Sequence, residues 1–319
     1  MRAVVQRRYG DPAAVLRVED VERPAAGDGE VLVRVLSAPV SGSDWHILRG
    51  LPYAARPVVG VRRPRAAIAG IEMAGVVEAV GPGVTAHAVG DEVFGWCDGA
   101  FAEYAAVPAD QVARRPANLT AEQAGALPIA GFTALQAVRD KGHVTAGTRV
   151  LITGATGCVG TYAVQIAKAL GAEVTAVCGA AKADLAKALG ADHVHDYATG
   201  GLPTGFDVLV DLYGNPSARE CAAAVRRGGT VVLTGGTGGR WFMGTDRWLR
   251  VLAAAPLLGF RATPLVHADR LEDLVALRDL VEAGDVTPVV DRTYQLDGVA
   301  RAVEDVRRGR VRGQAVVTP

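Results

Sequence analysis

Residues 151–171 read LITGATGCVGTYAVQIAKALG and are the most informative part of the sequence. A short apolar run that begins at Val150 leads into a turn with glycine at positions 154, 157 and 160. An amphipathic stretch follows, with apolar residues at helical spacing from Val159 to Leu170. The order of strand, glycine turn and helix predicts a dinucleotide-binding unit, which a second apolar strand over Glu173–Val177 supports.

The three glycines of this turn have different expected roles. Gly154 permits the tight turn, Gly157 lets a pyrophosphate approach the backbone, and Gly160 lets the helix pack close to the strand. The N-terminus of the helix then offers free N–H groups and the positive end of its dipole to the phosphates. The alternative is an ordinary turn between strand and helix that binds no ligand.

Composition limits the classes of partner. The 319 residues contain 34 Lys and Arg and 34 Asp and Glu, so nothing favours nucleic acid or an anionic membrane as a partner. The first twenty residues lack an apolar run, and no apolar run in the chain reaches about 18 residues, so we expect neither a signal peptide nor a membrane span. Four scattered cysteines without a C-x-x-C pair predict reduced thiols and a cytoplasmic protein.

The chain divides into three regimes along its length. Residues 1–117 alternate short strands with turns, and residues 285–319 return to strands with one helix near Gly298–Arg308. Residues 118–284 alternate helices with apolar strands, which predicts a doubly wound parallel sheet. The expected strands of that sheet are Arg149–Ile152, Glu173–Val177, Val194–Asp196, Val208–Asp211 and Thr230–Thr234. We expect the C-terminal segment to pack back on the N-terminal domain.

Several motifs come in the order seen in medium-chain dehydrogenases/reductases. They are GIEMAGVV at 70–77, GDEVFG at 90–95, AFAEY at 100–104, the glycine turn, AVQIAK at 163–168 and LGAD at 189–192. The chain most resembles the zinc-free quinone oxidoreductase branch of that superfamily. The resemblance implies an α/β fold with a GroES-like, β-rich catalytic domain over 1–117 with 285–319, and a Rossmann domain over 118–284. It also implies an active site in the cleft between the two domains.

The positions of the zinc ligands in the zinc-dependent relatives can be compared one by one. Ser41, Ile71 and Ile129 stand where a thiolate, an imidazole and a second thiolate would be needed. Isoleucine cannot bind a metal, and Cys97 is alone where relatives have a four-cysteine structural lobe. We therefore predict that the protein holds no metal.

Without zinc, the chemistry implied is hydride transfer to a carbonyl compound that is polarised by hydrogen bonds alone. The candidate donors are Tyr53, Ser41, Ser43 and His46. Tyr53 lies in the loop that faces the cofactor in similar proteins; the alternative is a packed aromatic side chain. Ser43 and His46 match a proton relay of the zinc alcohol dehydrogenases, although His46 also fits a purely structural role.

The coenzyme expected is NADPH. The segment Val177–Lys182 has no acidic residue to bind a ribose 2′-hydroxyl. Lys182 and Tyr197 match residues that flank the 2′-phosphate in similar reductases, although Lys182 could instead be an ordinary surface lysine. The candidate cofactor residues are Thr133, Gly154, Thr156, Gly157, Cys158, Val159, Gly160, Gly179, Lys182, Tyr197, Leu212 and Gly235.

The leading hypothesis is a zinc-independent, NADPH-dependent reductase of quinones or α,β-unsaturated carbonyls. One alternative is a ketone reductase that uses Ser43 and His46. Another is a non-catalytic NADPH-binding redox sensor, based on Cys158 in the glycine turn. The expected partners are a small-molecule substrate and a second copy of the chain, since the apolar segment Leu257–Val266 resembles an edge strand that pairs across a two-fold axis.

Overall fold

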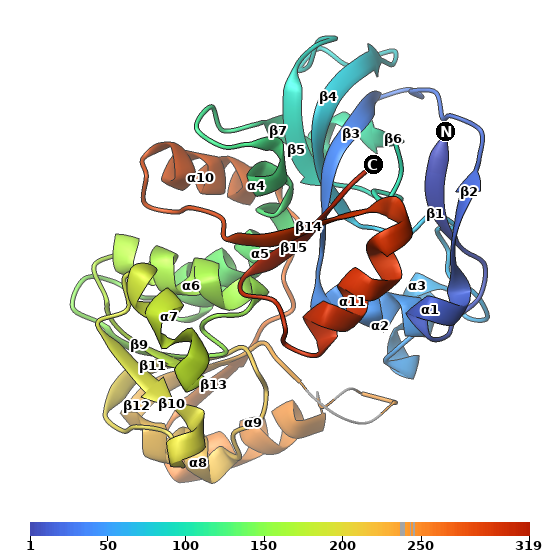
Figure 1. Cartoon of the computed structure of the whole chain (residues 1–319). Helices are drawn as coiled ribbons and strands as arrows, with labels where there is room; N and C mark the ends of the chain where they lie inside the picture. Colours follow the sequence, from blue (N-terminus) through green and yellow to red (C-terminus); the bar gives the residue numbers. More distant parts are fainter. Residues whose placement is uncertain (237–239, 243, 245) are drawn as a thin grey trace. The chain divides into compact units, whose positions relative to one another are not determined.

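The computed structural model describes residues 1–236, 240–242, 244 and 246–319, which divide into two compact units. The first unit comprises Met1–Ala130, Asp269–Gly284 and Pro288–Pro319. The second comprises Gly131–Ala268 and Asp285–Thr287. Figure 1 shows the helices and strands of both.

The second unit is built on a parallel sheet, which confirms the doubly wound prediction. Among the described residues its six strands follow the spatial order β10-β9-β8-β11-β12-β13. They are β8 (Arg149–Thr153), β9 (Glu173–Cys178), β10 (His193–Asp196), β11 (Phe206–Asp211), β12 (Val225–Leu233) and β13 (Arg261–Pro264). The strand order reverses beside β8, and ligands of such sheets bind at the carboxyl ends of the strands near this point.

Helices cover both faces of this sheet (Figure 1). They are α6 (Cys158–Ala169), α7 (Ala183–Ala188), α8 (Ala218–Ala224) and α9 (Asp246–Leu258). Cys221 of α8 and Val251 of α9 pack on Leu151, Leu209 and other residues of one face. Burial on both faces explains why the inner strands β8, β9 and β11 are largely apolar rather than alternating in the sequence, whereas the edge strands β10 and β13 are more exposed.

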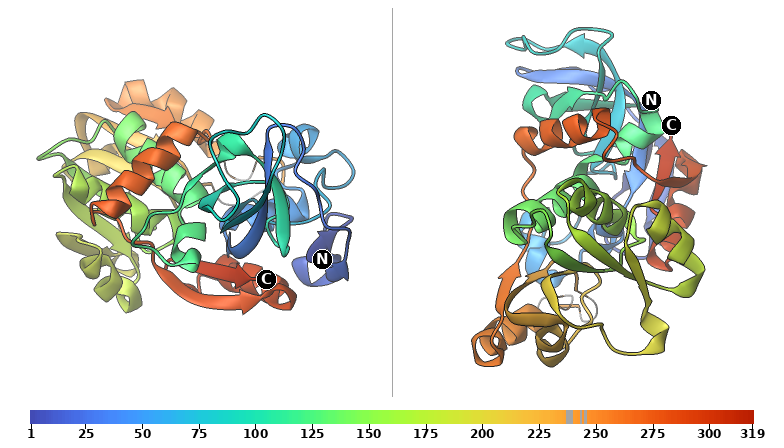
Figure 2. Two further views of the ribbon diagram at one scale, coloured as in Figure 1. Left: turned by 90° about the horizontal axis from the view of Figure 1, so that it is seen from above. Right: turned by 90° about the vertical axis from the view of Figure 1, so that its left-hand side faces the viewer.

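The first unit is rich in β-structure. Its larger sheet follows the order β14-β15-β3-β4-β5-β7, with β6 also paired to β3, and β1 and β2 form a separate hairpin. The strands are β1 (Arg2–Gln6), β2 (Leu16–Asp20), β3 (Glu30–Val40), β4 (Glu72–Val80), β5 (Glu92–Trp96), β6 (Tyr104–Pro108), β7 (Val112–Arg114), β14 (Val290–Gln295) and β15 (Gln314–Thr318). The C-terminal strand β15 pairs antiparallel with β3, so the end of the chain completes the N-terminal sheet (Figure 2).

Short helices complete the first unit. They are α1 (Pro12–Val15), α2 (Gly42–Arg49), α3 (Arg56–Val59), α4 (Ala121–Gly125), α10 (Leu271–Glu282) and α11 (Val299–Arg307). Asn118 Nδ2 donates to the carbonyl of Val281 at 2.7 Å, which ties the chain before α4 to the end of α10. The first unit therefore extends to Ala130 and includes α10, whereas the sequence interpretation placed the domain boundary at residue 117 and gave residues up to 284 to the Rossmann domain.

The segment expected as an edge strand over Leu257–Val266 is only partly a strand. Leu257 and Leu258 end α9, and β13 is limited to Arg261–Pro264. Gly259, between them, has φ of +79°, a conformation that commonly ends a helix. The expected strand was therefore too long.

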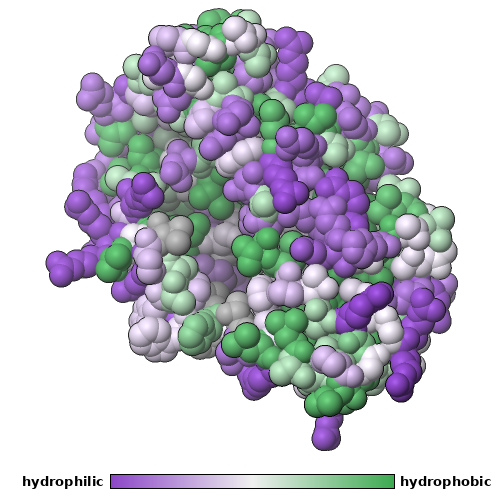
Figure 3. Space-filling view, turned by 180° about the vertical axis from the view of Figure 1, so that it is seen from behind, coloured by the Kyte–Doolittle hydropathy of each residue, from purple (hydrophilic) through white to green (hydrophobic). Residues whose placement is uncertain are grey.

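The described residues contain no helix long and apolar enough to cross a membrane. On the face drawn in Figure 3, hydrophobic residues lie in small groups between hydrophilic ones.

Candidate functional site

The glycine turn joins β8 to α6 at the carboxyl end of the parallel sheet. Gly154 has φ of +67°, which favours glycine, and its carbonyl accepts a hydrogen bond from the N–H of Gly157 at 3.0 Å. A Cβ at Gly160 would lie 2.1 Å from that same carbonyl oxygen, so only glycine fits there. The turn therefore has the close backbone packing that the sequence predicted for Gly154 and Gly160.

The same turn leaves room for a ligand at Gly157. A Cβ at this residue would meet only the Gly154 oxygen, at 3.3 Å, and no other atom within 4 Å. Cys158 and Val159 begin the 12-residue helix α6, whose first turn presents N–H groups and a positive dipole end. Thr156, beside Gly157, is buried. These residues fit the pyrophosphate of a dinucleotide.

Three further candidates lie at the carboxyl ends of β9 and β10. The hydroxyl of Tyr197 lies so near Gly179 that a Cβ there would be 3.1 Å away. Burial raises the pKa of the Cys178 thiol, Asp196 raises it further, and the charge of Lys182 lowers it. The charges of Lys182 and Asp196 therefore both affect the Cys178 thiol at the end of β9. Asp196 accepts the N–H of Ala198 at 3.0 Å, which starts the short helix that contains Tyr197.

Leu212 and Gly235 lie together at the ends of β11 and β12. A Cβ at Gly235 would come within 2.2 Å of the Leu212 carbonyl oxygen. The N–H of Leu212 donates to Thr153 Oγ1 at 3.1 Å, and Thr153 Oγ1 donates to Asp211 Oδ1 at 2.8 Å. Asp211 is fully buried and also pairs with Arg247. Sequence reasoning missed this network, because its members are far apart in the chain and match no motif.

The remaining cofactor candidate, Thr133, has a different setting. It is buried on the helix α5 (Pro128–Leu135), not at the end of a strand. The other candidates in the second unit gather at the carboxyl ends of β8 to β12, as the doubly wound fold predicts.

In the first unit, Ser41 caps the helix α2. Asp44 Oδ2 accepts the N–H of Ser41 at 2.7 Å and its hydroxyl at 3.0 Å. Burial raises the pKa of Asp44 to about 6, although both hydrogen bonds favour the carboxylate. The Ser41 hydroxyl is therefore engaged in a local cap.

Ser41, Ile71 and Ile129, which stand at the positions of zinc ligands in zinc-dependent relatives, lie near one another in the structure. Glu72, which follows Ile71, accepts the N–H of Ile129 at 2.8 Å. Burial raises the pKa of Glu72 well above its usual value, and the negative charge of Asp44, near Ser41, raises it further. Among the described residues, no three His, Cys, Asp or Glu side chains are arranged to hold a metal ion.

His46 lies on α2, three residues after Ser43. Burial lowers the pKa of its imidazole to about 4, and its Nδ1 has no hydrogen-bond partner among the described residues. No hydrogen bond joins His46 to Ser43 in the part of the chain that the structure describes. The ring of His46 packs edge-on against Trp45, with centroids 5.0 Å apart. A neutral, packed imidazole favours the structural role over a proton relay.

Tyr53 opens a short 3-10 helix (Tyr53–Ala55) and is half-buried. The guanidinium carbon of Arg56 lies 4.5 Å from the centre of its ring. Sequence reasoning identified the tyrosine and missed the arginine.

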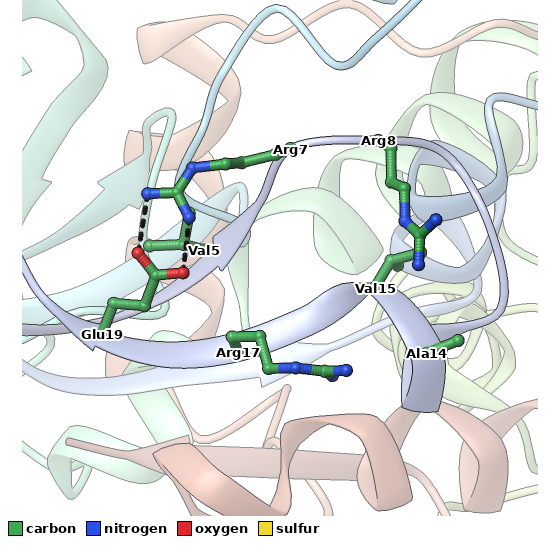
Figure 4. Close-up of a pocket in the computed structure, with 7 residues that line it drawn as sticks. All are labelled: Val5, Arg7, Arg8, Ala14, Val15, Arg17 and Glu19. Atoms are coloured by element: carbon green, nitrogen blue, oxygen red, sulfur yellow. Dashed lines mark hydrogen bonds and ion pairs between the residues drawn. The ribbon is translucent and has the colours of Figure 1, made fainter.

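A separate depression of about 290 Å³ lies on the β1–β2 hairpin. Figure 4 shows Arg7 paired with Glu19 there, and Arg8 and Arg17 beside them. It contains none of the predicted site residues.

Comparisons with known proteins identify the family of the chain. Residues 27–117 match the alcohol dehydrogenase GroES-like domain, and residues 189–317 match the zinc-binding dehydrogenase family. The chloroplast envelope quinone oxidoreductase homolog of Arabidopsis thaliana is 31% identical, over 100% of this chain and 98% of that protein. The mitochondrial NAD(P)H oxidoreductase RTN4IP1 of Mus musculus is 30% identical, over 99% of this chain and 89% of that protein.

Solved structures extend the comparison. The quinone oxidoreductase from Coxiella burnetii has a TM-score of 0.88 at 27% identity, over 100% of this chain and 99% of that one. These matches confirm the GroES-like domain and the α/β fold expected from the sequence.

Proposed function

Because the chain belongs to the medium-chain dehydrogenase/reductase superfamily, in its quinone-oxidoreductase-like branch, we propose that it reduces quinones or α,β-unsaturated carbonyls with NADPH. The family and the relatives of the chain support a nicotinamide-dependent oxidoreductase. The observation that carries the proposal is the glycine turn, in which Gly160 packs on Gly154 and leaves Gly157 open before α6.

Several candidate cofactor residues of the second unit have a proposed role in binding NADPH. Bound NADPH would supply the hydride, which adds to the β-carbon of an enone or to a quinone. The N-terminus of α6 holds the pyrophosphate, and Lys182 neutralises the 2′-phosphate. Leu212 and Gly235 shape the neighbouring wall, since they approach each other too closely for any side chain at residue 235.

The choice of NADPH rests on charge at the end of β9. Cys178 and Gly179 occupy the end of this strand, where an enzyme for the unphosphorylated coenzyme usually has an acidic residue. Asp196, at the end of β10, is hydrogen-bonded to the backbone N–H of Ala198. Lys182 is then the charged group best suited to a coenzyme phosphate.

The proton donor proposed is Tyr53. A phenol can donate a hydrogen bond to the oxygen that becomes negative as hydride arrives, and then deliver the proton. His46 is less suitable, because its low pKa leaves it without an acidic proton near neutral pH. This disfavours the ketone reductase that would use Ser43 and His46, and the isoleucines at 71 and 129 favour catalysis without zinc.

A homodimer is also proposed. The strand β13 pairs only with β12 among the described strands, so its outer edge is open. Leu257 and Val266, on either side of it, are 90% and 81% exposed, which suits a second copy of the same edge.

The proposal is tested by following NADPH oxidation with a quinone, an enone and a saturated ketone, with and without EDTA. We expect turnover of the first two that EDTA does not change. Tyr53→Phe should lower kcat by roughly 10²-fold, the usual effect of losing one such donor, with NADPH affinity unchanged. Activity on the ketone alone, or loss of activity in EDTA, would contradict the proposal.

A further inference from the structure

Arg56, the first residue of α3, lies between two aromatic rings of the first unit. Its guanidinium carbon is 4.5 Å from the ring centre of Tyr53 and 4.9 Å from that of Tyr9. Its Nε donates to the carbonyl of Gly50 at 3.0 Å. Three contacts therefore fix the half-buried guanidinium directly beside the proposed proton donor.

The ring of Tyr9 is itself held in place. Its hydroxyl donates to the carbonyl of Gly60 at 2.6 Å and lies 3.1 Å from that of Val59. Gly50 packs so close that a Cβ there would lie 2.7 Å from the ring. Because Tyr9 contacts both ends of residues 50–60, this loop is closed around Arg56.

Arg56 has no acidic partner in the part of the chain that the structure describes. Among the described residues it forms no ion pair, since its contacts are the two rings and one carbonyl. Residues 49–71 contain no Asp or Glu, and their charged residues are Arg49, Arg56, Arg62, Arg63 and Arg65. The chain as a whole is neutral, so this segment carries more positive charge than the average, although Arg49 is paired with Asp11 at 3.8 Å.

We propose that Arg56 binds an anionic group of the substrate, a carboxylate or a phosphate, next to the reacting carbonyl system. The planar guanidinium fork matches either group, and stacking on two rings orients it without neutralising it. The preferred substrate is then an α,β-unsaturated carbonyl compound that carries a negative charge. This inference rests on the proposed function, because it places the anion relative to Tyr53.

Kinetics on a matched pair test the preference. The enone 4-oxo-2-pentenoate and its methyl ester differ in charge, and the ester also carries one more methyl group and a more electrophilic double bond. The change in the ratio of their kcat/KM values between the wild type and Arg56→Gln therefore isolates the effect of the charge, because the intrinsic reactivities cancel. We expect the acid-to-ester ratio of kcat/KM to be roughly 10-fold to 100-fold higher in the wild type than in Arg56→Gln, the range for a hydrogen bond to a charged group. Arg56→Lys should keep part of this difference, and an equal ratio in the wild type and Arg56→Gln would contradict the inference. Arg62→Gln is the matched control, since it removes an exposed charge from the same segment, residues 49–71, but outside the loop around Arg56.

Binding provides a readout that needs no turnover. Calorimetry with 4-oxopentanoate, the saturated acid, should show binding to the wild type and to Arg62→Gln, and roughly 10-fold or more weaker binding to Arg56→Gln. Acetate and inorganic phosphate, used as competitors, indicate which anion the site prefers. If Arg56→Gln alone weakens binding but neither enone is reduced, the anion site stands and the proposed function fails. Equal binding in wild type and Arg56→Gln, or an equal loss in Arg62→Gln, would overturn the inference.

Discussion

Arg247 of α9 forms a buried ion pair with Asp211 at the carboxyl end of β11. Asp211 also accepts hydrogen bonds from Thr153 and from the N–H of Gly214, at 2.8 and 3.0 Å. The carboxylate therefore organises the loop that contains Leu212, one of the candidate cofactor residues.

Removing the arginine should leave this buried carboxylate without its counter-charge. We expect Arg247→Ala to lower the free energy of unfolding by about 3–5 kcal/mol and to weaken NADPH binding. Denaturant unfolding and fluorescence titration measure the two effects. Arg250→Ala is the matched control: Arg250 lies on the same helix in an exposed pair with Asp246, and its loss should change stability by less than about 0.5 kcal/mol. Similar losses in both variants would contradict the role assigned to the Asp211 pair.

Coenzyme preference depends on Lys182. We expect the wild type to bind NADPH more tightly than NADH, and Lys182→Ala to remove about 1.5–3 kcal/mol of that difference by weakening NADPH alone. Dissociation constants of both coenzymes for both proteins check this. Lys187→Ala, on the exposed part of α7, is the control. A wild type that prefers NADH would refute the coenzyme assignment.

Asp44 and His46, both on α2, should make the stability of the protein depend on pH in opposite directions. The pKa of Asp44 rises from 3.8 to about 6, so the folded state holds its proton more tightly and loses stability as pH rises through this range. The pKa of His46 falls from 6.5 to about 4, so the folded state gains stability as pH rises from 4 to 6.5. Each pKa difference between the folded and unfolded states corresponds to about 3 kcal/mol in the free energy of unfolding.

Two variants separate these effects. Between pH 4 and 6.5, the stability of the wild type relative to His46→Gln should rise by up to about 3 kcal/mol, and relative to Asp44→Asn it should fall by a similar amount. Urea unfolding at several pH values provides the data. If stability relative to the two variants changed with pH in the same direction, the burial of one of these side chains would be contradicted.

Cys158 should be the most reactive of the four cysteines. Cys97, Cys178 and Cys221 are buried, and burial raises the pKa of each, to about 12 for Cys97 and Cys221. Cys158 is half-buried at the N-terminus of α6, where the helix dipole favours a thiolate. Mass spectrometry after alkylation should show Cys158 labelled first and NADPH protecting it. Equal labelling with and without NADPH would eliminate the redox-sensor alternative.

The sequence predicted the parts of the structure that depend on local pattern. The strands β8, β9, β11 and β12 were found because buried parallel strands contain short apolar runs, and the glycine turn was found because its glycines follow such a run and precede a helix. The helix α9 was missed, although Val251 and Ala255 have the helical spacing of a buried face. The pairs Asp211–Arg247 and Tyr9–Arg56 could not be predicted, since each joins residues 36 or more positions apart that no spacing rule connects.

The turn after β8 is the proposed dinucleotide site, and the variant Gly157→Ala is its sharpest test. The backbone of Gly157, with φ of −88° and ψ of −178°, suits alanine, and the added Cβ would meet only the Gly154 oxygen at 3.3 Å. Gly160→Ala, whose Cβ would lie 2.1 Å from that oxygen, should instead destabilise the fold. We expect the free energy of unfolding of Gly157→Ala to lie within about 1 kcal/mol of the wild-type value. We also expect it to bind NADPH at least roughly 10-fold more weakly, because its methyl group occupies the approach of the pyrophosphate. An unchanged NADPH dissociation constant in a folded Gly157→Ala protein would contradict the proposed site.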